Sequence, residues 1–151
     1  MVWPIVVAWI HYIGIMLFLA CLLGEHLVLK PQPSLAEART LQILDGTYGA
    51  AATVVLITGV MRMFLEKGVD YYLHDVAFHI LVALFVIVAL LSIYPTVVFI
   101  RWRGVVRAGQ TPQLAAGQFG RIQMILRAEM ALLLLAPLFA TGMAHGWLTF
   151  R

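Results

Sequence analysis

Four long apolar runs decide what this chain can fold into. They cover residues 5–29, 46–64, 76–100 and 128–147, and the first has no charged residue between Ile5 and Gly24. A helix of about 20 residues crosses the roughly 30 Å hydrocarbon core of a bilayer. Because lipid offers no hydrogen bonds to exposed backbone groups, each run has to be helical. We therefore predict an all-α, polytopic membrane protein with a four-transmembrane-helix bundle.

The composition excludes several other classes of protein. Of the 151 residues, 63% are hydrophobic and 11% charged, and the mean hydropathy is +0.97. A soluble domain or a disordered segment does not have this balance. The net charge of +3 does not indicate a nucleic-acid partner, because the basic residues flank the apolar runs. Cys21 is the only cysteine, so no internal disulfide can form.

Local signals predict where the helices begin. We expect one domain over residues 1–151, with helices at about 5–29, 35–66, 76–101 and 112–147. Ser34 followed by Glu37 is a capping box, which favours a helix beginning at residue 35. Thr111 followed by Pro112 is typical of an N-cap and a first helical position, which favours a fourth helix beginning near Pro112.

The positions of lysine and arginine predict the orientation. One side of the membrane receives Lys30, Arg39, Arg101, Arg103, Arg107 and Arg121, and the other receives Lys67 and Arg151. The side richer in basic residues faces the cytoplasm. We therefore expect a multi-pass protein of the bacterial inner membrane, with both termini in the periplasm.

Two histidines in the apolar runs suggest a cofactor. His11 and His79 lie in the outer halves of the first and third predicted helices. Two imidazoles on different helices can be the axial ligands of a b-type haem. Arg62, near the same surface, could then bind the haem propionates. The alternative is that each histidine only forms a hydrogen bond to a neighbouring helix.

Three carboxyl groups are expected in the cytoplasmic half of the bundle. These are Glu25, Asp45 and Glu129, on the first, second and fourth helices. Arg101, Arg121 and Arg127 are within reach in principle, and ion pairs with them would fix the helix register. The alternative is a path for protons.

The chain resembles a family of small four-helix bacterial inner-membrane proteins that is known as a domain of unknown function. The similar segments are Ala8-Trp9-Ile10-His11-Tyr12, Leu44-Asp45-Gly46-Thr47-Tyr48-Gly49, Thr58-Gly59-Val60-Met61-Arg62, Glu66-Lys67-Gly68 with Tyr71-Tyr72, Ser92-Ile93-Tyr94-Pro95-Thr96, and Arg101-Trp102-Arg103. The resemblance covers nearly the whole chain and implies the four-helix fold, but no activity.

More distantly, the chain is similar to the HemJ-type membrane protoporphyrinogen oxidases, which bind haem. The similarity consists of Ile10-His11, Thr58-Gly59 and a basic position early in the third helix. In both families we expect lysine at that last position, where this chain has His79. The resemblance implies haem binding, and the histidine favours a second imidazole ligand.

We therefore predict a membrane protein that binds haem b and transfers electrons or oxidises a quinol or porphyrinogen. Such a protein would be a haem-dependent membrane oxidoreductase. Two alternatives stay open. One is an accessory or assembly protein that packs against a membrane partner or a second copy of itself. The other is a transport or metal-binding protein, with His11, His79 and His74 as ligands and the three carboxyl groups handling protons.

Overall fold

The protein is a bundle of helices in a computed structural model that describes residues 2–146. The elements in chain order are α1 (Trp3–Val28), α2 (Leu35–Leu65), α3 (Val69–Leu73), α4 (Val76–Arg101), α5 (Arg103–Arg107) and α6 (Gln118–Ala144). No β-strand occurs within these described residues. The stretches long and apolar enough to cross a membrane are Trp3–Val28, Leu35–Leu65, Val76–Arg107 and Gln118–Ala144. The predicted all-α class and the four spans are thus confirmed.

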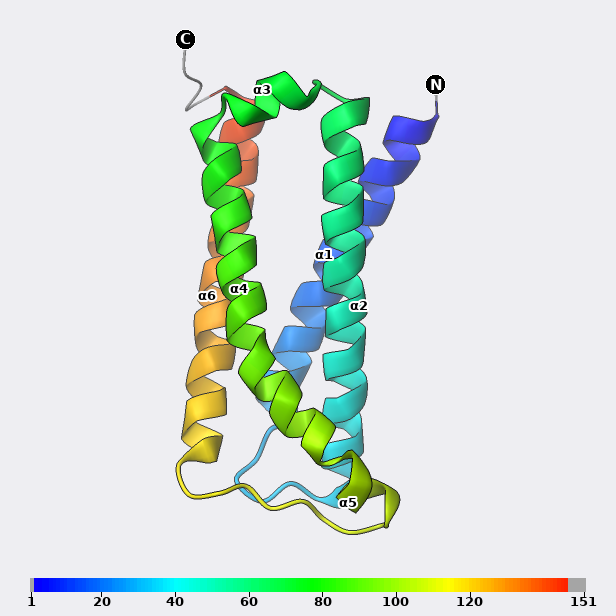
Figure 1. Ribbon diagram of the computed structural model, residues 1–151, viewed down its shortest axis with the longest axis vertical. Helices are drawn as coiled ribbons and strands as arrows, with labels where there is room; N and C mark the ends of the chain where they lie inside the picture. The colour runs from blue at the N-terminus through cyan, green and yellow to red at the C-terminus, as the bar shows by residue number, and fades with distance from the viewer. Residues whose placement is uncertain (1, 147–151) are drawn as a thin grey trace.

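The four long helices alternate in direction and form two closely packed pairs. One pair is α1 with α2, and the other is α4 with α6. Figure 1 shows α3 joining the pairs at one end of the bundle, called here the α3 end, and α5 at the opposite, α5 end. Helix α4 leans from α6 at the α3 end toward α2 at the α5 end, so the two pairs meet most closely near α5.

Three of the predicted helices match the structure to within two residues, but the start of the fourth is wrong. Helix α6 begins at Gln118 instead of near Pro112. Gly117, the residue before it, has a φ of 76°, a left-handed conformation through which an α-helix does not continue. Leu114 in the preceding segment packs against the core, which holds that segment outside the helix. The predicted end at residue 147 lies outside the described residues.

Capping side chains fix two of the helix starts. Ser34 Oγ accepts from the Glu37 backbone N–H at 3.2 Å, and the Glu37 carboxylate accepts from the Ser34 N–H at 2.8 Å, so the predicted capping box is present. At the start of α4, Asp75 accepts from the backbone N–H groups of Ala77 and Phe78. These contacts satisfy backbone donors that a helix leaves free at its N-terminus.

The buried core lies in the half of the bundle near α5. Its residues are Phe18, Cys21, Leu22 and Leu29 of α1 and its C-cap, Ala38, Leu41, Tyr48 and Ala51 of α2, Val88, Val98, Phe99, Trp102 and Val106 of α4 and α5, and Ile122 and Leu126 of α6. Toward the α3 end, α1 still approaches α2 closely at Gly14, where a β-carbon would come within 3.0 Å of Val55. Large apolar side chains elsewhere point outward, as lipid-facing helices require.

Leu126 gives a test of this core. It is completely buried, whereas Leu134 on the same helix is 67% exposed. Leu126→Ala leaves a cavity and should destabilise the folded protein by about 2 kcal/mol or more. Leu134→Ala removes the same atoms from a lipid-facing position and should change stability far less. Unfolding in mixed detergent micelles measures both, and equal effects would mean that the core is not where the structure has it.

Candidate functional site

Three membrane-buried carboxyl groups come together inside the core. Glu25 of α1, Asp45 of α2 and Glu129 of α6 are 2%, 8% and 1% exposed. They lie near enough that their charges would repel one another. We call these three residues together with Tyr48 the carboxyl cluster. The sequence predicted the three acidic residues at a common depth, and the structure gathers them from three different helices.

Two hydrogen bonds connect the cluster to neighbouring helices. The Tyr48 hydroxyl of α2 donates to Oε2 of Glu129 on α6 at 3.2 Å. The Thr96 hydroxyl of α4 donates to Oδ1 of Asp45 at 2.6 Å. Because Glu25 belongs to α1, all four long helices supply a polar side chain to one small region.

Some of the cluster's buried polar atoms have no partner. Oε1 of Glu25 and Oε1 of Glu129 are buried and receive no hydrogen bond, and the same is true of Nδ1 of the adjacent His26. Leaving such atoms without partners is costly in a protein interior, and few native proteins retain them without a reason. These oxygens are therefore the positions at which a proton or a small polar molecule would be stabilised most.

The predicted ion pairs are not formed. Within residues 2–146 the salt bridges are Lys30–Glu37 and Arg62–Glu66, so none of the three buried carboxyl groups is in a salt bridge, whether with Arg101 or with another residue. The other arginines considered are occupied elsewhere. Arg121 lies over the ring of Tyr94 at 5.6 Å, and Arg127 donates to Gln123.

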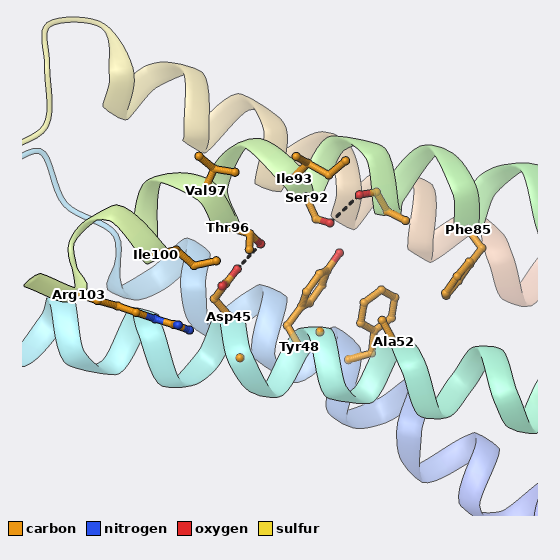
Figure 2. A pocket seen from close by; sticks show the side chains of 14 residues that line it. Asp45, Tyr48, Ala52, Phe85, Ser92, Ile93, Thr96, Val97, Ile100 and Arg103 are labelled. Carbon is orange, nitrogen blue, oxygen red and sulfur yellow. Dashed lines mark hydrogen bonds between the residues drawn. The ribbon is translucent and has the colours of Figure 1, made fainter.

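A groove between α2 and α4 opens onto the cluster. It has a volume of about 400 Å³. Figure 2 shows Asp45 and Tyr48 extending from α2 toward α4, with Thr96 facing Asp45 across the groove. Arg103 lies at the α5 end of the groove, near Asp45, and Phe85 lies toward the other end. Of the three carboxyl groups, Asp45 is the one that lines the groove.

His11 and His79, the predicted haem ligands, make separate contacts. Nδ1 of His11 lies 2.8 Å from the hydroxyl of Thr58 on α2, and its ring lies against Gly59. Since the Thr58 hydroxyl already donates to the Val54 carbonyl, His11 donates to Thr58 and keeps a free Nε2. Nδ1 of His79 lies 2.9 Å from the Asp75 carbonyl in the same helix.

The helices carrying these two histidines meet through side chains, such as the rings of Phe18 and Phe85 with centres 6.3 Å apart, and not through close backbone contact. Among the described residues, no Cα atom of α1 comes within 8 Å of one in α4. The bond from Nδ1 to a carbonyl one turn back also occurs at His74 and His145, so it does not distinguish His79. In the same range no three His, Cys, Asp or Glu side chains are grouped as a metal site would need. The His11, His79 and His74 metal site considered above is therefore not assembled.

Arg62, predicted to bind propionates, belongs to a polar network at the α3 end. Its guanidinium pairs with Glu66 one turn later, at 2.5 Å, and lies 5.2 Å from the centre of the Tyr12 ring. Tyr72 donates to the same Glu66 at 3.2 Å. Nearby, Lys67 and the Tyr71 hydroxyl donate to the last carbonyls of α6. This network ties α1, α2, α3 and α6 together at the membrane surface.

Sequence reasoning missed three residues of the site. Tyr48 follows Asp45 by three residues, a spacing that puts both on one helix face and could have identified it. Arg103 was treated as a marker of orientation, and both Arg103 and Thr96 entered only as members of segments that resemble the family. The hydrogen bond from Thr96 to Asp45 depends on how α2 and α4 are rotated relative to each other.

These observations define a four-helix membrane protein whose core holds a cluster of carboxyl groups that form no salt bridge within the described residues. The chain belongs to the DUF2214 family of predicted membrane proteins, whose family model matches residues 3–147. No curated protein and no solved structure matches the chain. The predicted family is thereby confirmed, and the link to the HemJ-type oxidases stays a prediction.

The α3-end network predicts a pH effect on stability. Burial, and then the adjacent Glu66 carboxylate, raises the pKa of Tyr72 from 10.0 to about 12. A group whose pKa is higher in the folded state stabilises the fold below its unfolded pKa and loses that contribution as pH rises through the folded pKa. Thermal unfolding midpoints of wild type should therefore fall between pH 10 and 12 more steeply than those of Tyr72→Phe. Parallel curves would show that Tyr72 does not contribute.

Proposed function

We propose that this protein binds and moves protons through the carboxyl cluster. One observation carries the proposal: Glu25, Asp45 and Glu129 are buried together in a membrane-spanning core with no lysine or arginine paired to any of them within the described residues. Ionisable groups placed in this way are costly and are characteristic of proton pathways in membrane proteins.

The energetics favour neutral carboxyl groups at this position. An unpaired carboxylate in a low-dielectric interior is destabilised by several kcal/mol, and a protonated carboxyl group avoids that cost. Each protonated group also gains an O–H that can donate to a neighbour. The free oxygens of Glu25 and Glu129 then have a use, as acceptors and donors of exchangeable protons.

The arrangement supports a stepwise path. Asp45 is the most exposed of the three groups and lines the groove, so protons would enter or leave the cluster there. Tyr48 has its hydroxyl on Glu129 and would carry a proton between the α2 side and the α6 side by rotating its O–H. Glu25 would accept protons on the α1 side of the cluster.

Glu129→Gln tests this function. The protein is reconstituted in liposomes containing a pH-sensitive dye, and proton uptake is followed after an external acid pulse or under an imposed potential. The amide keeps the size and the acceptor for Tyr48 but cannot exchange a proton, so uptake should fall by about tenfold or more. Glu37→Gln is the matched control, because glutamine retains the capping box at this exposed position and uptake should be unchanged.

Infrared difference spectroscopy supplies a readout that does not depend on transport. Wild type should show the C=O stretch of protonated carboxylic acids, reduced in Glu129→Gln and retained in Glu37→Gln. If wild-type liposomes take up protons no faster than empty ones and no such band is present, the proposal is wrong.

A b-type haem bound by His11 and His79 is the second candidate. The supporting observation is that each imidazole uses Nδ1 in a hydrogen bond and leaves Nε2 free, which is how ligating histidines are commonly oriented. Arg62 would stay paired with Glu66 and offer its remaining N–H donors to a propionate. Haem would supply one-electron chemistry for electron transfer or for oxidising a quinol or porphyrinogen.

The optical spectrum of protein purified from cells supplied with a haem precursor tests this candidate. A stoichiometric Soret band lost in both His11→Ala and His79→Ala would support haem binding. His145→Ala is the control, because His145 makes the same Nδ1 bond to a carbonyl one turn back. A colourless protein, or a band that survives both substitutions, would exclude this ligand pair.

A further inference from the structure

The groove between α2 and α4 changes in character along its length. At its α5 end stand Asp45, Thr96 and the guanidinium of Arg103, and toward the middle of the bundle the lining becomes apolar, with Ala52, Phe85 and Ala89. Along α2, Asp45 and Ala52 are seven residues apart, or about 10 Å. A ligand in this groove would therefore meet hydrogen-bonding groups at one end and only apolar surface at the other.

The groove has open space beside two of its lining residues. Gly46 and Gly49 of α2 both line it, and a β-carbon on either would meet no atom within 4 Å. The groove is therefore not closed by this chain's own side chains. Its volume of about 400 Å³ is within the usual range for small-molecule sites, which runs from roughly 300 to 1,000 Å³.

The hydrogen-bonding groups at the polar end favour a neutral head group that both donates and accepts. The Asp45 carboxyl offers an acceptor and Arg103 offers donors, while Glu25 and Glu129 lie behind Asp45 without cationic partners. A phosphate or carboxylate head only accepts hydrogen bonds and would leave the acceptor of Asp45 unused, whereas an amine only donates and would leave the donors of Arg103 unused. A ring with a hydroxyl or carbonyl oxygen on opposite sides satisfies both groups without carrying a charge.

We propose that this groove binds a membrane-soluble quinone or quinol, with its oxygenated ring at Asp45, Thr96 and Arg103 and its apolar tail directed past Phe85 into lipid. The aromatic rings of Phe18 and Tyr48, 4.4 Å apart, offer a surface for the ligand ring. This assignment deepens the proposed function and rests on it in one respect, because a quinol hydroxyl at Asp45 would share protons with the carboxyl cluster.

The test is a binding titration with decylubiquinone in protein reconstituted into lipid nanodiscs, followed by quenching of intrinsic fluorescence. Wild type should bind saturably above the linear partitioning seen in empty nanodiscs. Gly49→Leu places a side chain in the open groove without a clash and should weaken binding by about tenfold or more. Gly120→Leu is the matched control, because it adds the same side chain to open space on α6, away from the groove, and should bind as wild type does.

Other outcomes overturn the assignment. Equal binding by all three proteins, or linear partitioning alone, means that the groove does not hold a quinone. Displacement of decylubiquinone by oleate at equal concentration means that the groove takes an anionic acyl chain instead. The two proposals also fail separately: saturable, Gly49-sensitive binding without the carboxylic-acid infrared band would leave the quinone site standing and remove the proton function, and the reverse result would do the opposite.

Discussion

The interior of a bilayer has no partners for polar groups, and most of this structure follows from that. The backbone meets the constraint with four long helices, whose hydrogen bonds lie within each helix. The polar side chains toward the α5 end meet it by gathering in one place. Glu25 of α1, Asp45 and Tyr48 of α2, Thr96 of α4 and Glu129 of α6 form a region to which every long helix contributes. The carboxyl cluster thus sits where the two helix pairs meet, among the buried residues of the core.

The two ends of the bundle use polar residues in different ways. At the α3 end, Arg62 with Glu66 and Tyr71 with the end of α6 join helices near the membrane surface, with charges that are paired. Toward the α5 end, Asp45 and Glu129 accept hydrogen bonds, Oε1 of Glu25 accepts none, and none of the three carboxyl groups forms a salt bridge within the described residues. Paired groups at a surface mainly fix geometry, whereas unpaired acidic groups in a dry core favour binding protons. This contrast supports proton binding at the carboxyl cluster and a structural role for the polar network at the α3 end.

Much of the fold could be predicted because long apolar runs leave a membrane chain few choices. The capping box at Ser34 was equally decisive, since both of its hydrogen bonds are local. The start of α6 was not predictable from Thr111 and Pro112, because the left-handed Gly117 and the packing of Leu114 depend on tertiary structure. In this segment the tertiary contact of Leu114 therefore overrides the local signal for a helix start at Thr111 and Pro112.

The members of the site were easier to predict than their partners. Acidic residues in apolar runs are conspicuous, so Glu25, Asp45 and Glu129 could be identified from sequence. Which arginine lies near them could not, because Arg101 and Arg103 are two residues apart and so point about 200° apart around a helix. In a lipid-exposed helix both the core face and the outer face are apolar, so hydrophobicity does not reveal the rotation. The structure was needed to bring Arg103 to the groove and to leave Arg101 out.

The position of Asp45 connects the two proposals. It accepts from Thr96, lies near Glu25 and Glu129, and lines the groove that opens between α2 and α4. A proton released by a ligand in the groove would enter the carboxyl cluster at this one carboxyl group. A haem at His11 and His79 would lie in the other half of the bundle, near Thr58 and Asp75. The two candidate functions therefore use separate residues, and a quinol at Asp45, whose oxidation releases both protons and electrons, would give both halves of the bundle a role.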